Sequence, residues 1–73
     1  MSYRIGIDVG GTFTDFFVTH PDREPIVAKV LSTPVDSSIA VIQGLTEIAA
    51  GLDPALSLED FVGQIDTLSL IHI

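Results

Sequence analysis

Residues 5–15 have the sequence Ile-Gly-Ile-Asp-Val-Gly-Gly-Thr-Phe-Thr-Asp, and this stretch decides the fold. Apolar residues occupy the odd positions from Ile5 to Val9, and a period of two predicts a strand with one packed face. The pair Gly10-Gly11 then permits a tight turn, because glycine tolerates positive φ and a close backbone approach that a Cβ would prevent. The apolar residues 16–18 follow. We therefore expect a second strand, antiparallel to the first.

Five residues around this turn form the candidate site. A carboxylate near the end of an apolar strand is costly to bury unpaired, so Asp8 requires a cation, hydrogen-bond donors or water. Successive N–H groups of a glycine-rich turn form a concave anion site, which predicts that the amides of Gly10 and Gly11 hold phosphate. The hydroxyls of Thr12 and Thr14 can add donors to phosphate oxygens. Asp8 is the candidate ligand for Mg²⁺, through water, because Mg²⁺ dehydrates reluctantly.

A plain hairpin is the alternative interpretation of this stretch. In that case Gly10-Gly11 only makes the turn, and Asp8 caps a neighbouring amide. Two other glycine-rich phosphate motifs are excluded by spacing, since the sequence has neither Gly-x-x-x-x-Gly-Lys-Ser/Thr nor a Gly-x-Gly-x-x-Gly that leads into a helix. Asp15 is a weaker candidate, as a metal partner or as a brace of the turn.

Asp-x-Gly-Gly-Thr after an apolar strand resembles the first phosphate motif of the superfamily of actin, sugar kinases and heat-shock-chaperone ATPases. The longer string from Ile5 to Phe16 is more specific and resembles the start of the hydantoinase A, 5-oxoprolinase and acetone carboxylase family. Lys29 followed by Ser-Thr-Pro at 32–34, and Val-Ile-Gln-Gly-Leu at 41–45, agree with the same family. The resemblance covers about residues 3–69.

This resemblance implies that the chain is the opening half of an actin-like (ribonuclease-H-like) nucleotide domain. It implies a parent enzyme that is an ATP-dependent cyclic-amide hydrolase, opening 5-oxoproline or a hydantoin with ATP and Mg²⁺. It also implies a partner subunit or domain of the hydantoinase B type. ATP-dependent ketone carboxylation, as in the acetone carboxylase branch, is the alternative within the family. A third hypothesis is that the 73-residue product is inert by itself.

The end of the chain departs from this family. There, a strand like the one expected from Ile65 to Ser69 leads into His-Gly-Thr-Thr, whereas here Leu-Ile-His-Ile follows at 70–73. That string also resembles a translated sequencing adapter. We therefore expect residues 1–69 to be the N-terminal part of a hydantoinase/oxoprolinase domain and residues 70–73 to be a non-native tail of a truncated product. His72 is accordingly not aligned with the family histidine.

Composition excludes several classes of partner. Ten acidic and three basic residues give a net charge of −7, which argues against nucleic acid and against an anionic membrane surface. The chain has no cysteine, so neither disulfides nor a thiolate metal site can stabilise it. No charged leader with an apolar stretch and no run of about 20 apolar residues is present, and we expect a cytoplasmic protein.

The whole pattern predicts an α/β fold in which an antiparallel β-meander is followed by a crossover helix and a further strand. Two successive phenylalanines, Phe16 and Phe17, indicate that both faces of the sheet are partly covered, as in a larger domain. The expected elements are, in order, strands at 3–9, 14–19 and 26–31 with a polar turn at 20–25, a long helix ending near Gly51, a short helix from Leu58 to about Gly63 capped by Ser57, and a strand from Ile65.

The long helix has two candidate starts. Thr33 can cap a helix that begins at Pro34, and Asp36-Ser37 offers a start two or three residues later. Gly44 lies inside the helix and costs up to about 1 kcal/mol relative to alanine, which suggests close packing on the sheet. Gly51 is placed to end the helix. The apolar residues expected to face the core are Val35, Ile39, Ile42, Leu45, Ala49 and Leu52.

Several polar residues are rejected as functional candidates. His20 lies at a strand end beside a proline turn, where an exposed loop residue is the simpler interpretation. Lys29 lies within the third strand, where a lone lysine usually solvates a face or guards an edge. Glu59 and Asp60 are adjacent and point to different helix faces, so we interpret them as cap residues in the positive first turn of a helix.

Overall fold

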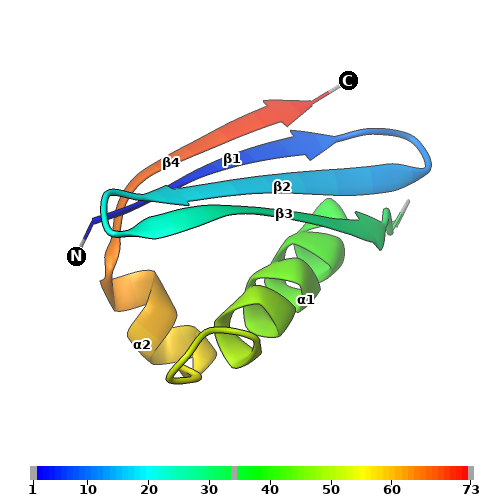
Figure 1. Cartoon of the computed structure of the whole chain (residues 1–73). Helices are drawn as coiled ribbons and strands as arrows, with labels where there is room; N and C mark the ends of the chain where they lie inside the picture. Colours follow the sequence, from blue (N-terminus) through cyan, green and yellow to red (C-terminus); the bar gives the residue numbers. More distant parts are fainter. Residues whose placement is uncertain (1, 34, 73) are drawn as a thin grey trace.

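The computed structural model describes residues 2–33 and 35–72, with the backbone alone for 70–72. A four-stranded mixed sheet carries both helices on one face (Figure 1). The elements are β1 (Tyr3–Val9), β2 (Phe13–His20), β3 (Arg23–Leu31), α1 (Ser37–Ala50), α2 (Leu58–Gly63) and β4 (Ile65–His72). The strand order is β3-β2-β1-β4, with β1, β2 and β3 antiparallel and β4 parallel to β1. The predicted meander, crossover helix and further strand are confirmed.

The second hairpin is tighter than predicted. The polar turn expected at 20–25 contracts to Pro21 and Asp22, because His20 and Arg23 already pair across β2 and β3. The Asp22 N–H donates to Nδ1 of His20 at 3.0 Å, which closes this turn. Pro25 therefore lies inside β3. A proline is tolerated there because β3 is an edge strand of the sheet.

The core lies between the sheet and the helices. Alternate residues of β1 point into it, and Phe16 of β2 is fully buried among them. A Cβ built on Gly44 of α1 would lie 2.2 Å from Cζ of Phe16. The phenylalanine ring thus occupies the space that a side chain at Gly44 would need, and the expected close packing of this glycine on the sheet is confirmed.

The buried face of α1 differs from the predicted one. Val35, Ile39 and Ile42 are 99%, 54% and 52% exposed, so placing these three in the core was wrong, whereas Leu45, Ala49 and Leu52 are buried as predicted. The buried residues within the helix are Ala40, Gly44, Leu45, Ile48 and Ala49. Gly44 lets the helix come close to Phe16 of β2, and the side of α1 around Gly44 is buried instead of the side that carries Ile39 and Ile42. Apolar periodicity does not detect a glycine at a close contact.

Both helix starts are capped by side chains. Asp36 is the N-cap of α1, as in the later of the two predicted starts, and its carboxylate accepts from the N–H and the hydroxyl of Ser38 at 3.0 and 2.7 Å. These hydrogen bonds lower the pKa of Asp36. The alternative start at Pro34 lies outside the described residues. Ser57 caps α2 by accepting from the Asp60 N–H at 3.2 Å, as predicted.

The opposite face of the sheet is open in the described part of the chain (Figure 1). Apolar side chains of β2 and β3 are exposed on this open face, including Phe17 and Val27. Within the described residues, no element covers this face, so the partial cover of both faces that was expected for a larger domain stays a prediction. Within residues 2–33 and 35–72, no helix is long and apolar enough to cross a membrane.

Candidate functional site

The turn between β1 and β2 closes on itself through one backbone hydrogen bond. The Gly10 N–H donates to the Phe13 carbonyl at 3.0 Å, and a Cβ at Gly10 would approach that same oxygen to 3.0 Å. The glycine at this position is needed for the close approach and not for positive φ, which no described glycine adopts. A Cβ at Gly11 would meet nothing within 4 Å. The space beside Gly11 is therefore open to a ligand.

The turn leaves two unused donors at its tip. Across the described residues, the N–H groups of Gly11 and Thr12 have no backbone hydrogen-bond partner, and both residues are exposed. The Gly10 amide, by contrast, is engaged inside the turn. The available anion-binding donors are thus the Gly11 and Thr12 amides with the Thr12 hydroxyl, one residue further along than the predicted pair of glycine amides.

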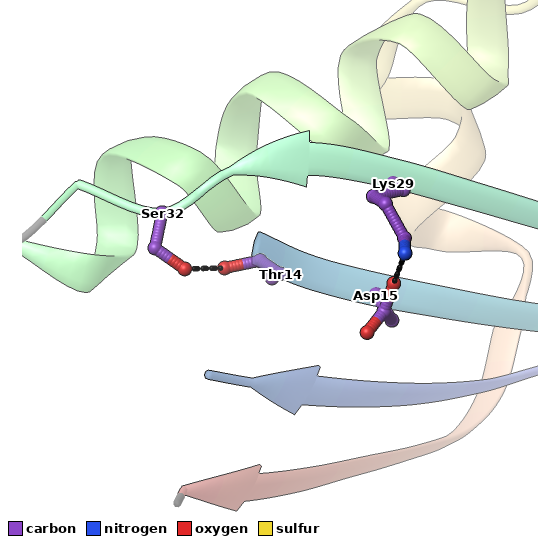
Figure 2. Close-up of polar contacts among 4 residues, drawn as sticks. All are labelled: Thr14, Asp15, Lys29 and Ser32. Carbon is purple, nitrogen blue, oxygen red and sulfur yellow. Dashed lines mark hydrogen bonds and ion pairs between the residues drawn. The ribbon is translucent and has the colours of Figure 1, made fainter. Parts of the chain in front are cut away.

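The Thr14 side chain is turned inward, beneath the turn. Thr14 is 0% exposed, and its hydroxyl lies 2.9 Å from that of Ser32, the residue that follows β3 (Figure 2). The Ser32 hydroxyl donates to the Gly10 carbonyl at 2.7 Å. Because a serine hydroxyl has a single proton to give, Thr14 is the donor of the pair. The predicted contact of Thr14 with phosphate stays a prediction, while its hydrogen bond to Ser32 is a bracing contact.

Asp8 faces its neighbour Asp15 directly across the β1–β2 ladder. Oδ1 of Asp8 is buried and has no hydrogen-bond partner within the described chain. Like charges opposite one another destabilise a strand pair, and an unsatisfied buried oxygen is costly. A positive charge between or beside the two carboxylates would therefore stabilise this strand pair.

Lys29 supplies one positive charge beside this pair. Its Nζ lies 3.6 Å from Oδ1 of Asp15 (Figure 2). The same Nζ lies 5.0 Å from the centre of the Phe13 ring. The other two basic residues are Arg4, the second residue of β1, and Arg23, the first residue of β3. Both lie at the far end of the sheet. From the sequence, Lys29 was expected only to solvate a face or guard an edge. Its place opposite Asp15 depends on a register shift between Val18 and His20, which no local pattern indicates.

A shallow groove of about 440 Å³ lies over these groups on the open face of the sheet. Its lining residues are Gly6, Ile7, Asp8, Asp15, Phe16, Phe17, Val27 and Lys29. The described residues contain no group of three or more side chains placed to hold a metal ion. Two carboxylates fit Mg²⁺, which keeps most of its water and uses one or two carboxylates with substrate phosphates. The residues present thus fit a water-shelled Mg²⁺ accompanied by phosphate.

Of the residues that the sequence analysis rejected as functional candidates, His20, Glu59 and Asp60 do not join the site. His20 packs against Tyr3 at 4.7 Å between ring centres, at the end of the sheet away from the glycine turn. Glu59 and Asp60 lie in the first turn of α2, as cap residues. The side chain of His72 lies outside the described residues.

The model of the hydantoinase/oxoprolinase N-terminal region matches residues 4–70. The chain belongs to this family. The caprolactamase subunit alpha of Pseudomonas jessenii is a curated relative that is 46% identical over 50 residues. These residues are 68% of this chain and 7% of the relative. The acetophenone carboxylase gamma subunit of Aromatoleum aromaticum is 44% identical over 64 residues, covering 88% of this chain and 8% of that subunit.

A solved structure agrees with the fold of this hydantoinase/oxoprolinase region. The nucleotide-free structure of acetone carboxylase, described as an enzyme of ATP-dependent acetone carboxylation, matches with a TM-score of 0.80 and 29% identity. The match covers 97% of this chain and 10% of that one. The opening half of the nucleotide domain is thereby shown. The chain spans less than a tenth of the curated relatives described above.

Proposed function

We propose that this chain forms the first phosphate-binding hairpin of an ATP-dependent enzyme that opens a cyclic amide such as 5-oxoproline or a hydantoin. The observation that carries the proposal is the glycine turn itself, where the Gly11 and Thr12 amides are free, together with the unpartnered carboxylate of Asp8 on the strand that leads into the turn. Donors aimed at an anion and a carboxylate suited to hydrated Mg²⁺ are the two parts that a nucleotide phosphate needs. The family membership and the relatives support this assignment.

Each residue of the turn has a distinct role in the proposal. Asp8 holds the water shell of Mg²⁺, and the Gly11 and Thr12 amides hold phosphate oxygens with the Thr12 hydroxyl. Gly10 contributes the close approach that shapes the turn, and Thr14 braces it from beneath. Bound ATP would supply a phosphoryl group that activates the lactam oxygen and makes a resistant amide a better electrophile. Phosphoryl transfer is catalysed chiefly by positioning and charge stabilisation of this kind.

ATP-dependent ketone carboxylation is the second candidate. The 0.80 TM-score to acetone carboxylase and the identity to the acetophenone carboxylase subunit favour it, whereas the caprolactamase subunit favours amide opening. The caprolactamase and acetophenone carboxylase relatives are subunits by name, which supports a partner subunit here. We propose that this partner is of the hydantoinase B type. ATP hydrolysis stimulated by 5-oxoproline or a hydantoin supports the first activity. Stimulation by a ketone with bicarbonate supports the second.

The phosphate role is tested in a full-length protein that carries this chain. Asp8→Ala removes the metal carboxylate, and Gly11→Val fills the open space beside the turn. We expect each to lower kcat/KM for ATP hydrolysis by about 10²-fold or more, as loss of a charge-stabilising group does. Thr46→Ala removes an exposed hydroxyl bonded only within α1 and is the matched control. If both site variants hydrolyse ATP like the control, the proposal is wrong.

A further inference from the structure

We infer that Ser32 is the positioning residue of the phosphate turn and that it aims the Gly11 amide outward. The inference rests on the proposed function and adds a residue from outside the glycine stretch. Ser32 is half-buried and lies 22 residues from Gly10 in the sequence, at the end of β3. It is the point at which the third strand contacts the turn.

Ser32 contacts the turn at three places. Its hydroxyl donates to the Gly10 carbonyl at 2.7 Å, and its N–H donates to the Thr12 carbonyl at 2.8 Å. The same hydroxyl accepts from Thr14, 2.9 Å away. One residue thus holds the carbonyl groups on both sides of Gly11 and is itself held by a buried threonine. Figure 2 shows the Ser32–Thr14 contact between the segment that follows β3 and the start of β2.

Because the peptide bond is planar, the hydrogen bond to the Gly10 carbonyl also fixes the direction of the Gly11 N–H. The Gly10 carbonyl and the Gly11 N–H belong to one peptide plane, and in a trans peptide they point in opposite directions. Because the carbonyl is drawn inward to Ser32, the Gly11 N–H points away from Ser32. The hydrogen bond at Gly10 therefore fixes the orientation of the amide that we assign to phosphate.

The Gly10-Gly11 turn needs a hydrogen bond from another segment to hold it in one conformation. Two consecutive glycines lose more conformational freedom on ordering than other residues, and neither has a side chain that could anchor the loop. Donors that are fixed before the ligand arrives stabilise charge better than donors that must reorganise. Thr14, Ser32 and Gly10 also form a chain of hydrogen bonds in which each bond polarises the next. The brace gives the turn its order without placing a side chain in the ligand space.

A matched pair of variants tests the inference in the full-length protein. Ser32→Thr keeps a hydroxyl on Cβ, whereas Ser32→Val introduces a side chain of the same shape as threonine but without the hydroxyl. KM and kcat for ATP are measured with the melting temperature of each variant. We expect Ser32→Val to raise KM for Mg·ATP about tenfold relative to Ser32→Thr, as loss of a well-placed hydrogen bond does. Ser32→Thr should remain near the unaltered protein.

The outcomes separate this inference from the proposed function. Equal KM values for Ser32→Thr and Ser32→Val, while Gly11→Val still abolishes ATP hydrolysis, would overturn the role of Ser32 and leave the phosphate turn standing. If Gly11→Val is itself without effect, the proposed function fails. Ser32→Ala adds no atoms, so it replaces Ser32→Val if the added methyl groups prevent folding. An Ala variant with unchanged KM likewise overturns the inference.

Discussion

At the scale of single residues, the site is an arrangement of charges on two neighbouring strands. Asp8 and Asp15 oppose each other, and Lys29 forms an ion pair with Asp15 at 3.6 Å. Counting these three side chains gives a local charge of −1, with the unpaired charge on Asp8. This division leaves Asp8 available to the metal while Asp15 is held by the lysine. If the turn binds nucleotide phosphate as proposed, the ion pair lowers the repulsion between the acidic side chains and that phosphate.

The role of Lys29 is predicted from that count. Lys29→Met keeps an apolar stem over Phe13 but leaves a local charge of −2, so we expect KM for Mg·ATP to rise about two- to fivefold, the scale of an exposed ion pair. The double variant Asp15→Asn/Lys29→Met returns the count to −1 and should recover the original KM. The measurement is ATP hydrolysis by the full-length protein at low salt, where such effects are largest. A double variant as impaired as Lys29→Met would contradict the charge argument.

At the scale of elements, features set within one stretch of sequence were predicted, whereas features that depend on contacts between distant segments were missed. The first hairpin follows from the alternation of Ile5 to Val9 and from the glycine pair, all within one stretch. The short helix follows from its Ser57 cap. Part of the inward face of α1 did not follow from the sequence, because it depends on the packing of Gly44 against Phe16, a contact that helix periodicity does not contain. The brace by Ser32 was missed because it depends on where β3 ends relative to the turn.

The contact between α1 and β2 carries a stability prediction. Gly44→Ala should gain about 1 kcal/mol of helix propensity. However, its Cβ would lie 2.2 Å from the Phe16 ring, so the ring or the helix must move. Overpacking of a core costs about 1–3 kcal/mol, and we expect net destabilisation in chemical denaturation. Gly63→Ala, where a Cβ meets nothing within 4 Å, is the control and should not destabilise. A Gly44→Ala variant as stable as Gly63→Ala would show that the packing is loose.

At the scale of the whole molecule, the site is only half enclosed. The groove over Asp8 is shallow, and the sheet face that surrounds it carries exposed apolar side chains. Nucleotide sites are concave and bury most of the ligand surface. The chain also carries a net charge of −7, with a single lysine near the turn. Both properties predict that tight nucleotide binding requires the rest of a longer protein.

Calorimetry on the 73-residue chain tests this requirement. We expect no binding of Mg·ATP with a Kd below about 1 mM, which corresponds to roughly −4 kcal/mol. Two free amides and one carboxylate supply too few contacts to offset the loss of ligand freedom and the repulsion between an acidic chain and a polyanion. The full-length protein, titrated under the same conditions, is the positive control. Micromolar binding by the chain alone, abolished by Gly11→Val, would show that the hairpin is a self-sufficient phosphate site and that enclosure by further segments contributes little to affinity.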